Sequence, residues 1–424
     1  MHDLRMLRDQ IDVLREGLRR RGALESLSPV LQRAEGLDQQ RRMLIVAADE
    51  RKAARNSNAQ EVARRKKAGE AADELMAMGR SLGDEIGKLE AELRDVESAL
   101  QGILLEIPNV PLAEVPDGGE AKNVIVKTWG TPRTGGTLAP HWEIGGRLGL
   151  IDIERSAKIS GSGFIVYRGM GARLVRSLLN FFMDMHATEH GYEEVWPPQL
   201  VTRQTMTGTG QLPKFEDDAY SLSGDDMFLI PTAEVPVTNL YRDEIVDGAM
   251  LPAAFVAYSK CFRREAGSAG KDTRGVLRTH EFDKVELVRY ATPETSGAEL
   301  EQLTRHAETC LERLELPYRR KLLAAGDTGF SSAMTYDLEC YAAGVGAWLE
   351  VSSCSNFGDF QARRANIRYR AARGEKPRFV HTLNGSALAF PRTLACLLEH
   401  NLNDDGSVTI PAALRPYAGV DRIG

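Results

Sequence analysis

Residues 261–287 read CFRREAGSAGKDTRGVLRTHEFDKVEL, and the rest of the chain is best interpreted from this stretch. From Thr279 onward, apolar and charged residues alternate with the period of a half-buried strand. The pattern predicts a strand, a loop rich in glycine and charge, and a returning antiparallel strand. Phe282 and Glu286 are four residues apart and would lie on one face of the returning strand. Arg263 and Glu265 would form the facing wall.

These residue types suit a bound nucleotide. A guanidinium can neutralise and orient a phosphate, and an aromatic face can stack on a base. Carboxylates can bind a substrate ammonium or a metal ion. A charged surface hairpin with one core phenylalanine explains the same short motif, because short motifs also match by chance. Other parts of the chain must therefore decide between the two interpretations.

Composition indicates a globular protein. The chain has 424 residues, of which 42% are hydrophobic and 27% charged, and this length predicts about two or three domains. The first ten residues mix both charges, and no run of about 18 apolar residues occurs. We therefore expect a cytoplasmic protein without a membrane span. A disulfide framework or zinc site is not expected, because the cysteines are odd in number and lack a CxxC pair: Cys261, Cys310, Cys340, Cys354 and Cys396.

Charge is unevenly distributed along the chain. The net charge is −6, yet residues 41–67 contain nine basic and three acidic residues. That segment is therefore +6 and the remainder −12. A local basic element on an acidic body favours one specific polyanionic partner over general nucleic-acid coating.

The first hundred residues have helical periodicity. Leucines and one isoleucine recur every three or four residues from Leu4 to Leu18. Ser26 and Ser28, followed by Pro29, predict a helix that restarts there with a capping serine. A second helix has a heptad seam from Leu75 to Ile103. The pattern predicts an antiparallel hairpin that turns at residues 67–72, with helices of roughly 35 residues.

Basic residues would lie in the outer half of this hairpin. A solvated helix face would explain the charges alone, and the heptads could instead serve a dimerising coiled coil. Length, seam and clustering together favour a nucleic-acid-binding arm. The candidate residues are Arg51, Lys52, Arg55, Arg64, Arg65, Lys66 and Lys67.

The segment 107–120, IPNVPLAEVPDGGE, interrupts the helical pattern with three prolines and a glycine pair. It predicts an N-terminal domain over residues 1–108 and a second domain over 109–424. Strands and helices do not alternate regularly after the boundary, which predicts an α+β fold with a mainly antiparallel sheet flanked by helices. Residues 193–201 look like one strand. No P-loop or Rossmann motif occurs, and the loop 266–275 is expected to be flexible, with Lys271 and Arg274 reaching outward.

Three segments in chain order resemble the signature motifs of class II aminoacyl-tRNA synthetases. They are GYEEVWPPQLV (191–201), FRRE…HEFDKVE (262–286) and NGSALAFPRTLACLLEHN (384–401). Four further segments, behind the long helical hairpin, resemble bacterial-type seryl-tRNA synthetases: PTAEVP (231–236), TYDLE (335–339), EVSSCSN (350–356) and DFQARRANIRYR (359–370). The resemblance covers essentially the whole chain, and the combination of motifs is highly specific.

The resemblance implies a serine–tRNA ligase with a class II catalytic domain. Such an enzyme activates L-serine with ATP to seryl-adenylate and transfers the seryl group to the 3′ end of tRNA(Ser). The resemblance leaves open whether tRNA(Sec) is also a substrate. It implies Mg²⁺ beside ATP, no zinc, and a homodimer formed through the first motif. The hairpin would bind the long variable arm and elbow of the tRNA by shape and backbone charge.

The resemblance also assigns site residues. Arg263, Glu265 and Arg392 are the implied catalytic residues, and Glu350 and Ser353 the implied Mg²⁺ ligands. Serine would be bound by Thr232, Ala233, Glu234, Arg263, Glu286 and Ser386, the first three forming a loop over the amino acid. ATP would be bound by Arg263, Arg264, Glu265, Thr279, Phe282, Glu350, Val351, Ser352, Ser353 and Arg392.

Two other functions are compatible with parts of the sequence. A synthetase-like ligase that charges a carrier protein would lack the long basic hairpin. A non-catalytic tRNA-binding paralogue would have lost Arg263, Glu350 or Arg392, and all three are present.

Overall fold

The computed structural model describes residues 1–266 and 274–424, so Lys271 lies outside the described residues. The chain forms two compact units. The first comprises Met1–Arg19 and Ala23–Pro108, and the second comprises Arg20–Gly22 and Asn109–Gly424. None of the helices in these described parts is both long and apolar enough to span a membrane.

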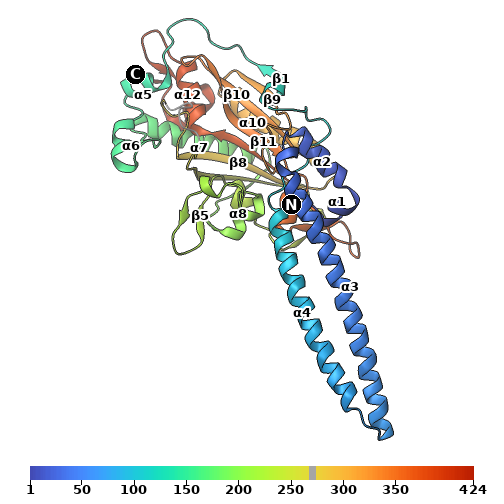
Figure 1. Cartoon of the computed structure of the whole chain (residues 1–424). Coiled ribbons are helices and arrows are strands. Elements are labelled where there is room, and N and C mark those ends of the chain that lie inside the picture. Colours follow the sequence, from blue (N-terminus) through green and yellow to red (C-terminus); the bar gives the residue numbers. More distant parts are fainter. Residues whose placement is uncertain (267–273) are drawn as a thin grey trace. The chain divides into compact units, whose positions relative to one another are not determined.

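The first unit is helical, with α1 (Leu4–Asp9), α2 (Ile11–Arg20), α3 (Leu24–Ala68) and α4 (Asp73–Leu104). Figure 1 shows α3 and α4 side by side as the predicted antiparallel hairpin. Buried apolar residues of both helices form the seam, among them Leu31, Leu44, Ile86 and Leu100. Gly69 ends α3 with a φ of 71°, a left-handed conformation that glycine adopts readily.

A new helix does start near Ser26–Pro29, after the break that follows α2, but the predicted serine cap and first-position proline are wrong. Helix α3 already begins at Leu24, and Pro29 lies inside it. The two serine hydroxyls do not cap the helix. Ser28 Oγ instead donates to the carbonyl of Leu24 at 2.7 Å, and Ser26 Oγ donates to that of Ala23 at 3.1 Å. Pro29 is the sixth residue of α3 and has no N–H to donate to the carbonyl of Glu25, so the helix lacks one intrahelical hydrogen bond there.

The second unit is built on an eight-stranded sheet of order β1-β9-β10-β11-β14-β8-β7-β2. All neighbours pair antiparallel except β2 and β7, so the predicted mainly antiparallel α+β fold is confirmed. The strands are β1 (Val124–Trp129), β2 (Glu193–Val195), β7 (Ala253–Phe262), β8 (Glu281–Ala291), β9 (Tyr318–Leu322), β10 (Met334–Ala342), β11 (Ala347–Asn356) and β14 (His381–Ala389).

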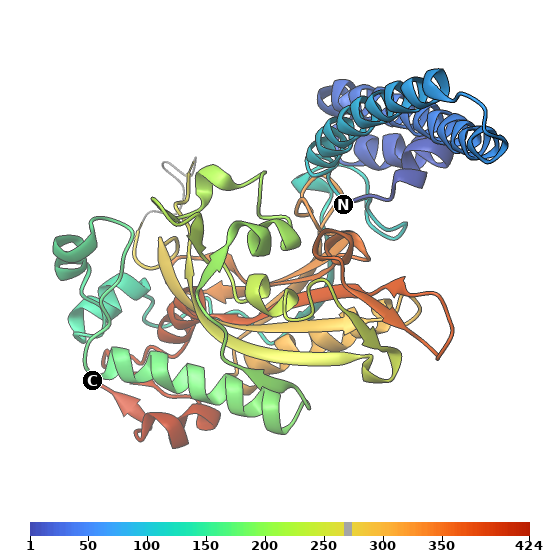
Figure 2. The same cartoon turned by 90° about the horizontal axis from the view of Figure 1, so that it is seen from below.

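One face of this sheet carries the main core. Helices α7 (Met170–Thr188), α10 (Ser296–Arg313) and α12 (Phe390–His400) pack on it, joined to Val285 and Leu287 of β8 in one buried cluster. Figure 2 shows α7, in green, running along that face. Because side chains alternate along a strand, the intervening residues of β8 point to the opposite face.

Smaller elements complete the second unit. One small sheet joins β13 (Arg378–Phe379), β12 (Arg368–Arg370) and β6 (Ile245–Asp247), another joins β3 (Leu200–Thr202), β5 (Met227–Leu229) and β4 (Ser221–Leu222), and a third pairs β15 (Val408–Thr409) with β16 (Arg422–Ile423). The short helices are α5 (His141–Arg147), α6 (Ile153–Ser160), α8 (Arg203–Thr209), α9 (Glu234–Thr238), α11 (Phe360–Ala365) and α13 (Arg415–Ala418). Single 3-10 turns lie at Glu120–Lys122, Glu216–Asp218, Gly248–Met250 and Ala412–Leu414.

The strand predicted over residues 193–201 is divided in the structure. Strand β2 ends at Val195, and β3 begins at Leu200 in a different sheet. Pro197 and Pro198 fall between them. Proline cannot donate a ladder hydrogen bond, which explains why one strand does not continue through this pair.

Candidate active site

The predicted hairpin at residues 261–287 is formed by β7 and β8. Their antiparallel register places Cys261 opposite Phe282 and Ala257 opposite Glu286. Phe282, Lys284 and Glu286 alternate with core residues of β8 and therefore face away from the main core. Arg263 follows β7 directly and bonds through its backbone N–H to the carbonyl of His280 at 2.9 Å.

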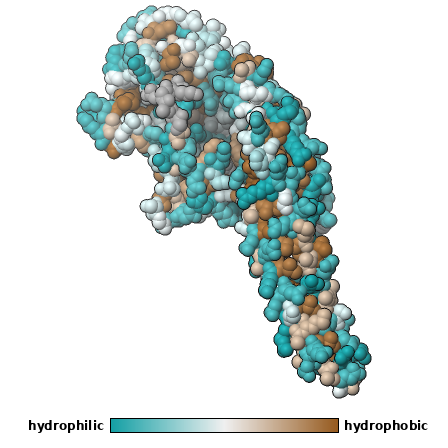
Figure 3. Space-filling view, in the orientation of Figure 1, coloured by the Kyte–Doolittle hydropathy of each residue, from teal (hydrophilic) through white to brown (hydrophobic). Residues whose placement is uncertain are grey.

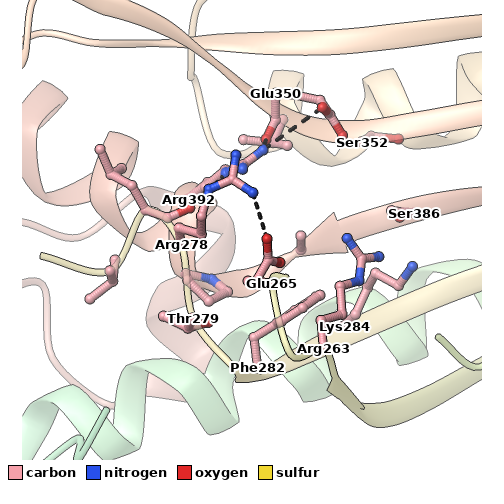
Figure 4. A pocket seen from close by; sticks show the side chains of 15 residues that line it. Arg263, Glu265, Arg278, Thr279, Phe282, Lys284, Glu350, Ser352, Ser386 and Arg392 are labelled. Atoms are coloured by element: carbon pink, nitrogen blue, oxygen red, sulfur yellow. Dashed lines mark hydrogen bonds and ion pairs between the residues drawn. The ribbon is translucent and has the colours of Figure 1, made fainter. Parts of the chain in front are cut away.

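A cavity of about 530 Å³, here named cavity A, lies beside this hairpin. Figure 4 shows side chains from β8, β11 and the start of α12 converging on it. The segment 276–279 also contributes to its wall. Its lining is Arg263, Glu265, Val276, Leu277, Arg278, Thr279, Phe282, Lys284, Glu350, Val351, Ser352, Ser386, Ala389, Pro391 and Arg392.

Charged side chains in cavity A are held by defined contacts. Arg278 Nη1 donates to Glu265 Oε2 at 2.5 Å, a pair drawn in Figure 4. Arg392 Nε donates to the carbonyl of Leu277 at 3.0 Å, and its Nη1 donates to that of Glu350 at 2.9 Å. The guanidinium of Arg263 lies 5.1 Å from the ring centroid of Phe282. Hydrogen bonds thus orient Arg278 and Arg392, and Arg263 lies against the ring of Phe282.

A second cavity of about 1000 Å³, cavity B, adjoins the first. The two share Arg263, Lys284, Glu350 and Ser386. Cavity B adds polar groups from other elements, among them Thr232, Glu234, Glu286, Ser353 and Asn384. A ligand that fills both cavities would therefore pass Arg263.

Buried charge is concentrated where the cavities meet. Lys284 Nζ lies 2.5 Å from Glu286 Oε2, and both side chains are almost fully buried. Ser386 Oγ donates to the same Glu286 oxygen at 3.3 Å. Gln361 Nε2 donates to Glu234 Oε1 at 2.6 Å. Burial, together with the nearby Glu286 carboxylate, raises the pKa of Glu234 to about 7.

A third cavity of about 750 Å³, cavity C, contains acidic groups. Asp337 of β10 lies opposite Ser353 of β11, and Glu350 also lines this space. Oδ1 of Asp337 is buried and has no hydrogen-bond partner among the described residues. Burial and then the charge of Glu350 raise the pKa of Asp337 well above its usual range. The described residues contain no group of three or more His, Cys, Asp and Glu side chains placed to hold a metal ion.

Comparison with known proteins places both units in one family. Residues 1–111 match the family model of the seryl-tRNA synthetase N-terminal domain. Residues 214–401 match that of the class II tRNA synthetase core domain for G, H, P, S and T. The chain is 66% identical over 420 residues to a serine–tRNA ligase from Gemmatimonas aurantiaca, with 99% of each chain covered. The chain belongs to the seryl-tRNA synthetase family.

Other relatives agree with this assignment. A serine–tRNA ligase from Carboxydothermus hydrogenoformans is 51% identical, with 100% of this chain and 99% of the relative covered. A crystal structure of seryl-tRNA synthetase from Pyrococcus horikoshii complexed with ATP superposes with a TM-score of 0.95 at 36% identity, covering 100% of this chain and 99% of the other. The predicted enzyme class, an aminoacyl-tRNA synthetase that is a serine–tRNA ligase, is confirmed.

The structure brings most of the predicted seryl-tRNA synthetase residues together. The predicted ATP residues line cavity A with two exceptions: Ser353, which lines cavities B and C, and Arg264. Of the predicted serine residues, Ala233 is fully buried and is not among the described lining residues. Arg264 is exposed and likewise does not occur among the described residues that line these two cavities.

Sequence reasoning missed two charged residues of the site. Lys284 lies two positions after Phe282 and two before Glu286, so the same alternation that placed those two could have identified it. Arg278 precedes Thr279 in a segment without regular periodicity. No pattern in the sequence indicates that Arg278 contacts Glu265.

The predicted basic residues of the hairpin differ in their surroundings. Arg51 and Lys52 pair with Glu85 and Glu90 of α4 at 2.8 and 2.9 Å. Arg64 and Arg65 both contact Glu61. The side chains of Arg55, Lys66 and Lys67 are exposed. On the face visible in Figure 3, hydrophilic side chains cover the end of the hairpin.

Proposed function

We propose that cavities A and B bind ATP and L-serine side by side, so that the enzyme forms seryl-adenylate where they meet and then charges tRNA(Ser). The observation that carries this proposal is the position of Arg263, which lines both cavities. One guanidinium can contact the α-phosphate of ATP and the carboxylate of serine together. Residues 109–424 would form the catalytic domain and residues 1–108 the tRNA-binding domain.

At the serine end, Glu286 would accept the substrate ammonium. The ion pair with Lys284 and the hydrogen bond from Ser386 hold its carboxylate in one position. Ser386 and Thr232 supply hydroxyls beside it. Polar groups that bond the serine hydroxyl would reject alanine, because they would be left unpaired in a buried site.

At the nucleotide end, Phe282 would stack on adenine, backbone groups at Thr279 would meet the base edge, and Arg392 would reach the terminal phosphate. Glu265, held by Arg278, would contact ATP beside Arg263. A carboxylate oxygen of serine attacks the α-phosphorus, and the bond to the bridging oxygen breaks as pyrophosphate leaves. The ribose hydroxyl at the 3′ end of the tRNA then attacks the acyl carbon, and AMP departs. Positioning and charge neutralisation suffice for both steps.

Mg²⁺ fits the residues present. Glu350 and Ser353 would hold it, and Asp337 offers a buried carboxylate oxygen without a protein partner among the described residues. Few protein ligands are expected for this ion, which commonly binds one or two carboxylates, substrate phosphates and water. When bound, it would neutralise charge on the phosphates.

The hairpin would bind tRNA through its exposed cations. Arg55, Lys66 and Lys67 are the strongest candidates, because Arg51, Lys52, Arg64 and Arg65 already make ion pairs. Binding to phosphates predicts a strong dependence on salt. tRNA(Sec) would be a second substrate if it presents the same backbone shape.

A homodimer and a cytoplasmic location complete the proposal. Strand β2 is an edge of the main sheet, and Trp196, directly after it, is 66% exposed. A large exposed aromatic beside a sheet edge is typical of a surface covered by a partner. Charged tRNA is used for translation in the cytoplasm. Sedimentation should then give twice the chain mass of 46.8 kDa.

Serine-dependent ATP–pyrophosphate exchange without tRNA tests the adenylate step. We expect exchange with serine and little with threonine, alanine or cysteine. Glu286→Gln should raise the KM for serine far more than that for ATP. Exchange with alanine or glycine in place of serine would indicate a carrier-protein ligase. No exchange with any amino acid would indicate a non-catalytic paralogue.

Charge removal on the hairpin tests the tRNA proposal. Replacing Arg55, Lys66 and Lys67 with alanine should raise the KM for tRNA(Ser) at least tenfold and leave exchange unchanged. A matched control replaces three exposed cations of the catalytic unit, Arg370, Arg373 and Lys376. Equal effects of the two triple variants on tRNA binding would contradict a specific role of the hairpin.

A further inference from the structure

A buried polar contact lies behind cavity A. His141, at the start of α5, and Glu399, near the end of α12, are both fully buried. Oε1 of Glu399 contacts His141 Nδ1 at 2.8 Å and accepts from the His141 backbone N–H at 2.9 Å. Neither residue is among the described residues that line cavity A.

The hydrogen bonds determine the tautomer of His141. The backbone N–H of Val276 donates to His141 Nε2 at 3.1 Å. An accepting Nε2 carries no proton, so the neutral ring must carry its proton on Nδ1 and donate it to Glu399. His141 therefore acts as a donor on one side and an acceptor on the other.

Glu399 also binds a second segment beside the cavity. Its Oε2 accepts from the backbone N–H groups of Gly344 at 2.7 Å and Val345 at 3.0 Å. These residues form the turn between β10 and β11, and β11 carries Glu350. One buried carboxylate thus accepts four N–H bonds, which satisfies it without a cation.

The hydrogen bond between Val276 and His141 connects His141 to the wall of cavity A. Val276 and the next residue, Leu277, both line that cavity. The carbonyl of Leu277 accepts from Arg392 Nε at 3.0 Å. Arg392 and Glu399 lie seven residues apart on α12 and therefore on one face of it. The short segment is held to α12 directly by Arg392 and indirectly by Glu399 through His141.

Backbone segments pack closely around His141. A Cβ at Gly275 would lie 2.1 Å from His141 Nε2, and Gly275 has a φ of +67°. A Cβ at Gly344 would lie 2.0 Å from the carbonyl oxygen of Ala139. Both backbone segments therefore approach the His141 region at glycine positions.

We propose that His141, held in one tautomer by Glu399, is a positioning residue that fixes Val276 and Leu277, and through Leu277 the guanidinium of Arg392, for ATP binding. The inference rests on the assignment of cavity A to ATP. His141 contacts no reacting atom in this scheme. It supplies an acceptor that the buried Val276 N–H would otherwise lack.

Two substitutions at His141 separate this role from simple packing. Gln places an amide oxygen near the position of Nε2 and can accept from Val276, whereas Asn can reach only Glu399. In pyrophosphate exchange, His141→Asn should raise the KM for ATP about tenfold, equivalent to about 1.4 kcal/mol. His141→Gln should keep the KM for ATP close to the wild-type value. The KM for serine should change less than twofold in both variants.

A second variant keeps the test decisive if the buried substitutions do not fold. Gly275→Ala would push its methyl group against His141 Nε2 and should raise the KM for ATP in the same way. Equal ATP KM values for His141→Asn and His141→Gln, or an unchanged value for Gly275→Ala, would overturn the proposal. Serine-dependent exchange by the wild-type enzyme tests the proposed function separately, so the two failures are distinguishable.

Discussion

Glu234 is a buried acid whose protonation should affect stability. Its pKa is raised to about 7 from a model-peptide value of 4.5, first by burial and then by the charge of Glu286. The folded protein therefore holds this proton more tightly than the unfolded chain. The resulting stability is complete below about pH 4.5 and is lost as the pH rises through about 7. Over that range wild type should lose up to about 3 kcal/mol relative to Glu234→Gln.

Melting temperatures of wild type and Glu234→Gln, recorded between pH 4.5 and 8, check this prediction. Glu312→Gln provides a control that should run parallel to wild type over this range, because the contribution of Glu312 is lost only below about pH 4.5. Hydrogen bonding and the charge of Arg305 lower the pKa of Glu312, so its contribution is present at neutral pH and lost in acid. Parallel wild-type and Glu234→Gln curves would contradict the assignment of the raised pKa.

At the scale of single residues, the sequence identified side chains that regular periodicity places. The spacing of Phe282 and Glu286 put both on the face that the β7–β8 register now shows. Lys284 was not identified, although the same alternation places it on the same face of β8. His141 could not be found this way, because its partners Val276 and Glu399 lie more than a hundred residues from it in the chain.

At the scale of elements, the α3–α4 seam should stabilise the first unit. Ile86 of α4 is 5% exposed, whereas Met78 of the same helix is 52% exposed. Ile86→Ala leaves a cavity and should cost about 2 kcal/mol, the lower end of the usual range, since only two helices surround it. Met78→Ala should change stability by less than about 0.5 kcal/mol. Urea unfolding followed by far-UV circular dichroism measures both, and similar midpoints for the two variants would contradict a packed seam.

Element boundaries were less predictable than element types. The heptads identified α4 and the turn before it, because a seam of leucines repeats over many residues. Pro29 misplaced the start of α3, since proline near a helix start is compatible with either a new helix or a continuing one. Residues 193–201 had strand-forming residues, but the prolines within them separate two sheets.

At the scale of the whole molecule, composition and local motifs predicted two parts but not the order of strands. The eight-stranded order places β14 between β11 and β8, although β14 follows both in the chain. Such pairings depend on long-range packing that no local pattern encodes. The cavities between these strands follow from that order and so could not be described from the sequence.

The two units should unfold separately, because each has its own buried core. All four tryptophans, Trp129, Trp142, Trp196 and Trp348, belong to the second unit. Tryptophan fluorescence therefore follows that unit alone, while far-UV circular dichroism also follows the hairpin. A non-hydrolysable seryl-adenylate analogue at a hundredfold excess over its Kd should stabilise the fluorescence transition by about 2.7 kcal/mol. Ile86→Ala should shift only the unfolding transition of the hairpin, which circular dichroism detects and tryptophan fluorescence does not. One coincident transition that moves in both experiments would mean that the units unfold together, and the proposed division at residue 108 would then not separate two independent domains.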